Sequence, residues 1–185
     1  MGGALRSRAG EVARASFLAL AACTTSNGSP GAESTADADT CEPYTSDADL
    51  SAPSVSFAQT IGPLFAANCA VGGGINCHGA GNSLPFLGST DGGIDASIIL
   101  DSIVEVEAGE DPEMDFVAPN APEQSFLMHK MDGDQCTLAA QCALSIYNEY
   151  YPSCGASMPF LPHALLPAAV RDQVRAWISQ GAQNN

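Results

Sequence analysis

The residues best suited to chemistry lie in the stretch CAVGGGINCHG at positions 69–79. Cys69 and Cys77 are separated by seven residues, three of them consecutive glycines, and His78 directly follows the second cysteine. Two thiols and an imidazole suit three kinds of site: covalent haem attachment with histidine as an iron ligand, a disulfide loop, or a zinc site that takes one more cysteine. A c-type haem motif has only two residues between its cysteines, so the spacing alone favours the disulfide loop.

The N-terminus predicts an export signal, which bears on the cysteine chemistry. Arginines precede a short apolar run, and Leu20-Ala21-Ala22-Cys23 resembles the lipobox of bacterial lipoproteins. Residues 1–23 are therefore interpreted as a lipoprotein signal peptide, with Cys23 acylated to anchor the chain without a spanning helix. Export to an oxidising compartment disfavours the zinc site. The six remaining cysteines suit three disulfides, or two disulfides and two haem thioethers.

The charge of the chain excludes one class of partner. The formal net charge is −15, and loss of Arg6, Arg8, Arg14 and Glu11 with the leader would leave 6 − 3 = 3 basic and 21 − 1 = 20 acidic residues. A surface this acidic repels phosphate backbones, so nucleic-acid binding is not expected. No run of 18 apolar residues predicts a membrane-spanning helix.

The elements that must position the motif are predicted to be helices. Residues 24–54 are poor in large apolar side chains and are expected to form a disordered acidic linker, followed by one domain over 55–183. Ser56 and Gln59 form a capping box for a helix that leads into Cys69. A second helix is expected from Asn120 to Met131, and a third between Pro167 and Gly181. With long Gly/Pro-rich connections and no alternating strands, these predict an all-α domain.

The order of motifs resembles a known family. After the Cys69…Cys77-His78-Gly79 element come Pro122-Glu123-Gln124-Ser125-Phe126-Leu127 and Lys130-Met131-Asp132-Gly133. They are followed by Cys154-Gly155-Ala156-Ser157-Met158-Pro159 and by Trp177-Ile178-Ser179-Gln180-Gly181-Ala182. This series is similar to the cytochrome c-like domains of exported myxobacterial and planctomycete lipoproteins, and it covers about residues 55–183. Each motif is weak alone, and the order and spacing carry the resemblance.

The resemblance implies a haem c site and a set of ligands. His78 would be the proximal iron ligand, Cys69 and Cys77 the thioether donors, and Met158 the distal ligand. The expanded spacer departs from the usual motif, and its glycines would have to fold back to restore the sulfur spacing. The resemblance also implies a disulfide between Cys136 and Cys154, which leaves Cys142 for Cys41.

Other candidate ligands stay open. His129 or one of the methionines 114, 128 and 131 could replace Met158, although Met131 fits a core stripe better. His163 is interpreted as a surface residue, and Trp177 as a packing residue. The acidic run over 105–115 is expected to be a solvated loop, with a calcium site as an alternative.

The predicted function is electron transfer rather than catalysis, since no nucleophile–base pair stands out. We expect a membrane-tethered monohaem c-type cytochrome in the cell envelope, facing the periplasm and more readily on the outer than the inner membrane. Its acidic surface predicts a redox partner with a basic docking patch. The alternative is a haem-free, disulfide-stapled lipoprotein domain that binds a partner.

Overall fold

The computed structural model describes residues 41–51, 53–70, 78–79, 85–88, 95–150, 152–159 and 165–185. The leader 1–23 with its Cys23, the linker up to residue 40, Cys77 and His163 lie outside the described residues. Within them, no helix is long and apolar enough to cross a membrane.

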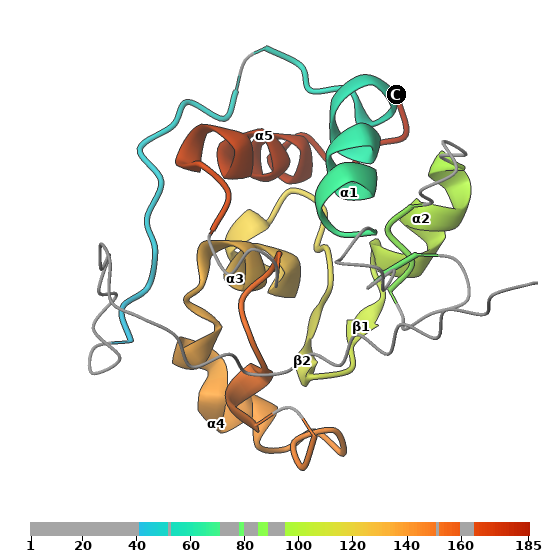
Figure 1. The fold of residues 1–185 in the computed structure, drawn as a ribbon. Helices are drawn as coiled ribbons and strands as arrows, with labels where there is room; N and C mark the ends of the chain where they lie inside the picture. The colour runs from blue at the N-terminus through green and yellow to red at the C-terminus, as the bar shows by residue number, and fades with distance from the viewer. Residues whose placement is uncertain are drawn as a thin grey trace, which may run out of the picture. The chain divides into compact units, whose positions relative to one another are not determined.

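The described chain contains five α-helices with short 3-10 and π turns, joined to a two-stranded sheet (Figure 1). The α-helices are α1 (Gly62–Asn68), α2 (Ala96–Ile103), α3 (Phe126–Asp132), α4 (Ala139–Cys142) and α5 (Ala168–Ser179). The short turns are η1 (Phe57–Ile61), η2 (Pro122–Gln124), η3 (Gln135–Leu138) and η4 (Pro152–Cys154). The strands are β1 (Glu107–Ala108) and β2 (Asp111–Asp115).

The all-α prediction was wrong, because β1 and β2 pair antiparallel. Glu107 opposes Asp115 and Ala108 opposes Asp111, with an irregularity in the register between the two pairs. The residues of β2, DPEMD, have low strand propensity, so the acidic run looked like a solvated loop. The pairing places Ala108 and Asp111 in fully buried positions, and the next residues lead to the buried Val117. Burial at these positions therefore outweighs the unfavourable local propensity.

The first and last predicted helices have the expected signals. The Ser56 side chain accepts from the backbone of Gln59, and the helical segment continues through η1 and α1 to Asn68. The last helix, α5, starts after Pro167 and is followed by Gly181 in a left-handed conformation. Trp177 is 1% exposed, which confirms its packing role. It contacts the rings of Phe57 and Phe65, so the two ends of the domain share one core.

The second predicted helix is shorter than expected and does not start at Asn120. Residues 122–124 form the 3-10 turn η2, and α3 begins only after Ser125, whose backbone is extended. The Ser125 hydroxyl lies within hydrogen-bond distance of the Ala118 amide and the Ala121 carbonyl, rather than capping α3. Gly133 ends α3 in a left-handed conformation, as the sequence indicated.

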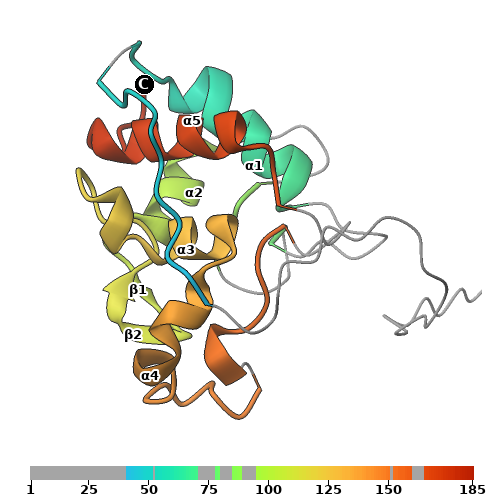
Figure 2. The same cartoon turned by 90° about the vertical axis from the view of Figure 1, so that its left-hand side faces the viewer.

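Residues 41–51 have no helix or strand, yet they contact the folded body. The Tyr44 ring lies over the guanidinium groups of Arg171 and Arg175, 4.3 and 5.1 Å from their central carbons. Its backbone amide donates to Asp134 at 2.7 Å, and Ser46 donates to Asp172 on α5. Figure 2 shows this segment in cyan, running past α5 and α3. The start of the predicted domain is therefore preceded by a stretch that binds to it.

Candidate functional site

The two ends of the glycine-rich stretch are joined by a backbone hydrogen bond. Cys69 caps α1, and the amide of His78 donates to the carbonyl of Cys69 at 3.2 Å. In one α-helical turn, an amide donates to the carbonyl four residues earlier, which is also the separation of the first cysteine and the histidine in Cys-x-x-Cys-His. Cys69 and His78 are nine positions apart, so this one bond brings their backbones together but is not by itself the helical turn of the short motif.

The His78 ring is oriented by its surroundings. Its Nδ1 lies 3.1 Å from the carbonyl oxygen of Pro85. Because a carbonyl oxygen can only accept, Nδ1 carries the proton, and the lone pair of the neutral ring is on Nε2. The backbone carbonyl of His78 also accepts from Leu87 at 2.8 Å. Metal-binding histidines commonly donate their second ring nitrogen to a carbonyl in this way, which fixes both the tautomer and the ring plane.

The segment that carries Pro85 is held by two helices. Ser102 of α2 places its hydroxyl 2.8 Å from the Phe86 carbonyl. Gly88 has a φ of +141°, and a Cβ there would lie 3.1 Å from the Cα of Ala66 on α1. A side chain at this position would therefore push the segment away from α1. Leu87 is 3% exposed and belongs to the main core with Cys69, which is 6% exposed.

Met158 lies in a loop that Lys130 of α3 holds at two points. The Met158 amide donates to the Lys130 carbonyl at 2.7 Å, and the Lys130 ammonium donates to the Cys154 carbonyl at 2.6 Å. Met158 is half-buried. These two bonds hold the backbone around Met158 against α3.

The other methionines have different surroundings. Met128 and Met131 of α3 are each 1% exposed and belong to the main core, as the core stripe predicted for Met131. Met114 on β2 is half-buried and lines a separate hollow.

The structure places the four other cysteines in disulfides, with different partners from those expected. Cys41 is bonded to Cys136, and Cys142 to Cys154. The implied pairs Cys136–Cys154 and Cys41–Cys142 were wrong. The reason is local: α4 and η4 pack together, so the cysteine at the end of α4 meets the cysteine at the end of η4. Cys136, in η3, is left beside the incoming 41–51 segment.

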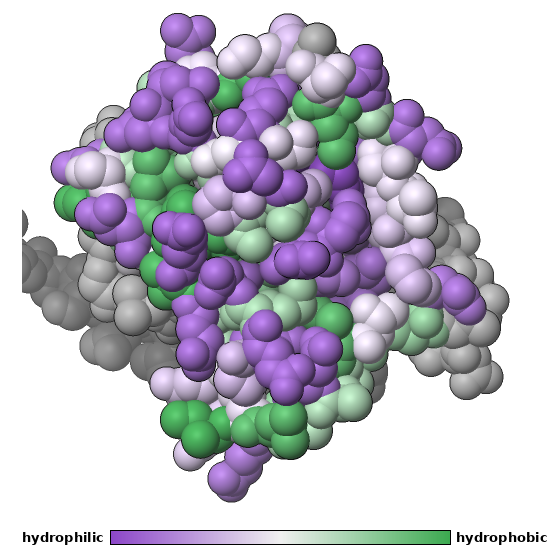
Figure 3. All heavy atoms as spheres, turned by 180° about the vertical axis from the view of Figure 1, so that it is seen from behind, coloured by the Kyte–Doolittle hydropathy of each residue, from purple (hydrophilic) through white to green (hydrophobic). Residues whose placement is uncertain are grey.

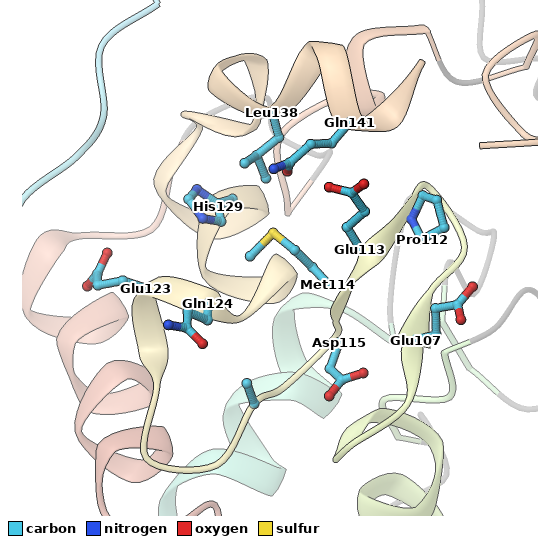
Figure 4. A pocket seen from close by; sticks show the side chains of 11 residues that line it. Glu107, Pro112, Glu113, Met114, Asp115, Glu123, Gln124, His129, Leu138 and Gln141 are labelled. Atoms are coloured by element: carbon cyan, nitrogen blue, oxygen red, sulfur yellow. The ribbon is translucent and has the colours of Figure 1, made fainter. Parts of the chain in front are cut away.

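A concave region lies between β2, η2, α3 and α4, with a volume of about 530 Å³ (Figure 4). Four carboxylates line it, those of Glu107, Glu113, Asp115 and Glu123. His129 also lines it, but its Nδ1 lies 2.8 Å from Asp134. This hydrogen bond to Asp134 raises the pKa of His129. In the described parts of the chain, no group of three or more histidine, cysteine or acidic side chains is arranged to hold a metal ion.

The basic side chains are distributed differently from these carboxylates. The three arginines and lysines that follow Cys23 are all buried: Lys130 is 6%, Arg171 6% and Arg175 1% exposed. Both arginines pair with Asp132 of α3, and Arg175 also binds Glu123 at 3.1 Å. In the described residues, Arg175 therefore offsets the exposed Glu123, together with Asp172, while the guanidinium and ammonium groups themselves lie inside the fold. The net charge can be counted from the residues, but the burial of the basic side chains depends on the fold.

Comparison with protein-family models, with curated proteins and with solved structures found no match. The resemblance to cytochrome c-like domains therefore rests on the order of motifs, and the geometry around His78 is the structural feature that bears on function. Sequence reasoning missed Pro85 and Lys130 as supports of the site. The only available signals were a proline seven residues after the histidine and the only lysine in the chain.

Proposed function

We propose that the protein is a membrane-tethered, monohaem c-type cytochrome that carries electrons in the cell envelope. The observation that carries the proposal is the setting of His78. Its amide donates to the Cys69 carbonyl and its Nδ1 lies against the Pro85 carbonyl, so the backbones of the histidine and the first cysteine meet and the imidazole is held in the way common for ligand histidines. A disulfide loop between Cys69 and Cys77 has no need of an oriented imidazole.

The proposal gives each candidate residue a role in holding the group. Cys69 and Cys77 would hold the haem through thioethers, His78 would bind the iron through Nε2, and Met158 would take the sixth position. A bound haem would supply an iron that takes up and releases one electron. The chain's own residues would orient the ligands: Pro85 holds the imidazole, and Lys130 holds the backbone of Met158. The apolar core around Cys69 and Leu87 would exclude water from the adjoining haem edge.

The surface supports the choice of partner. Because the cations after Cys23 are buried, the exposed charges are carboxylates, which would attract a redox partner with a basic patch. Such docking weakens as salt rises, since the charges are exposed and screened. Acylation at Cys23 would keep the domain near the membrane, with the outer membrane as the preferred location.

The test is the absorbance of the full chain purified from the envelope of a host with haem-attachment machinery. We expect a Soret band and a haem stain that survives a denaturing gel, both lost in His78→Ala. His129→Gln is the matched control, because His129 is also half-buried but donates to Asp134, and it should keep both signals. Equal signals in the two variants would refute the assignment of His78. A colourless wild-type protein would refute the cytochrome and favour the haem-free binding domain.

A further inference from the structure

The exposed apolar side chains of the domain gather in one loop. In the described residues, six large hydrophobic side chains are strongly exposed, and four of them lie within residues 144–150. They are Leu144 (67%), Ile146 (85%), Tyr147 (45%) and Tyr150 (73%). Figure 3 shows hydrophobic atoms in green at the lower edge of the molecule, the end where Figure 1 places α4. A contiguous apolar patch on an otherwise acidic surface indicates a contact site.

A disulfide and several hydrogen bonds hold the conformation of this loop. The disulfide between Cys142 and Cys154 closes its base. Inside it, the amide of Tyr147 donates to the Ser145 hydroxyl at 3.0 Å, and the amide of Tyr150 to the Tyr147 carbonyl at 2.9 Å. The Ser145 hydroxyl in turn donates to the Gly109 carbonyl, next to β1. The fold therefore presents these side chains outward through specific bonds.

The same part of the chain is almost without charge. From residue 135 to residue 170, Glu149 is the only acidic or basic residue apart from His163. The remainder of the chain after Cys23 carries the other 19 of its 20 acidic residues. A basic protein partner would be attracted to the carboxylates, not to this neutral loop. Tyrosine with leucine and isoleucine is instead the composition of side chains that enter a membrane–water interface.

The cysteine that binds the N-terminal segment lies just before α4, in the stretch of chain that leads into the exposed loop. Cys41 is bonded to Cys136 in η3, which runs directly into α4, and the loop follows α4. Cys136 and Cys142 are six residues apart in this helical segment, a rise of about 10 Å. Cys41 is only 18 positions after Cys23, so the bond to Cys136 cannot lie more than about 65 Å from an acyl anchor.

We infer that the loop over residues 143–150 inserts into the headgroup region of the membrane that holds the lipid anchor. The inference rests on the lipid anchor of the proposed function and not on the haem. Leu144 and Ile146 enter the boundary with the acyl chains, and the hydroxyls of Tyr147 and Tyr150 stay among the headgroups. The contact turns the charge-poor end of the domain to the bilayer and leaves the carboxylates facing the aqueous side.

The experiment uses the full, acylated chain in phosphatidylcholine vesicles that contain a phosphatidylcholine with a photoactivatable diazirine in its acyl chain. After illumination, mass spectrometry locates lipid adducts on the protein. We expect adducts on residues 143–150 at least about tenfold above those on α2. Ile98 of α2 is the matched reference, because it is 53% exposed and equally apolar. Leu144→Ser with Ile146→Ser should remove the adducts, and Ile98→Ser should not.

The outcomes separate the loop from the anchor. Acylated Cys23 with no adducts in the loop, or with adducts spread equally over α2, overturns the membrane contact and leaves the anchor standing. Unmodified Cys23 overturns both. A loop that is unlabelled by lipid but crosslinks to a protein in intact envelopes would assign it to a protein partner, which also overturns the inference.

Discussion

Replacing Lys130 with methionine would test how the fold positions Met158. Lys130 is 6% exposed, and burial lowers the pKa of its ammonium group. The ammonium donates to the Cys154 carbonyl, while the Lys130 carbonyl accepts from Met158. Lys130→Met keeps the approximate length of the side chain but removes the bond to Cys154 and the contact of the ammonium with the Phe126 ring. The backbone bond to Met158 remains.

The expected magnitude follows from these contacts. A hydrogen bond from a charged donor contributes about 1.5–3 kcal/mol. Its loss would raise the population of molecules in which the loop over 154–158 has left α3 by about 10- to 150-fold. The free energy of unfolding should change much less, because removing a buried ammonium also removes its desolvation cost. Lys130→Met should therefore weaken the attachment of the loop to α3 more than it lowers the free energy of unfolding of the domain.

The assay is the near-infrared sulfur-to-iron charge-transfer band of the oxidised protein, read beside urea unfolding. We expect Lys130→Met to lower the band and to make it disappear at a lower temperature, with a similar unfolding midpoint. Met158→Ala should abolish the band, and Met114→Ala should leave it unchanged. An intact band with unchanged thermal behaviour in Lys130→Met would refute the role of Lys130 in holding the loop.

Three further predictions concern stability. Joint replacement of Cys41 and Cys136 by alanine should lower the free energy of unfolding by up to about 4.7 kcal/mol, since the bond closes a long loop; an unchanged urea midpoint would contradict this. Because the hydrogen bond to Asp134 raises the pKa of His129, the pair stabilises the fold fully below pH 6.5, and this contribution is lost as the pH rises through the raised pKa. His129→Gln should remove this pH dependence from unfolding curves, and a retained dependence would assign it elsewhere. Burial raises the pKa of Asp111, so stability should fall as the pH rises from 3.8 through that pKa, and Asp111→Asn should flatten this profile in unfolding curves.

The helices that pack on the core could be predicted because their signals are local. The apolar stripe of α5 and the caps around it depend on residues close in sequence, as does the capping box at Ser56. The sheet could not be predicted in the same way. Its strand residues have poor propensity, and the pairing depends on burial of Val117 against elements far along the chain.

The site shows the same division. The sequence named His78 and Met158 as candidates, but the supports of both residues depend on long-range contacts. The carbonyl of Pro85 and the ammonium of Lys130 act through positions that only the folded chain defines. The predicted disulfide partners were wrong for a related reason, because the spacing of cysteines in the sequence does not indicate which helical turns will pack together. Likewise, the burial of every cation after Cys23 follows from pairing with Asp132 and from packing.

The intact mass of the mature chain shows whether a haem is attached. Thioether formation adds each thiol across a vinyl group without loss of atoms, so we expect the mass of the chain plus one complete haem, with the haem mapped to the peptide that contains Cys69, Cys77 and His78. A chain without haem, two hydrogens lighter because Cys69 is bonded to Cys77, would contradict it.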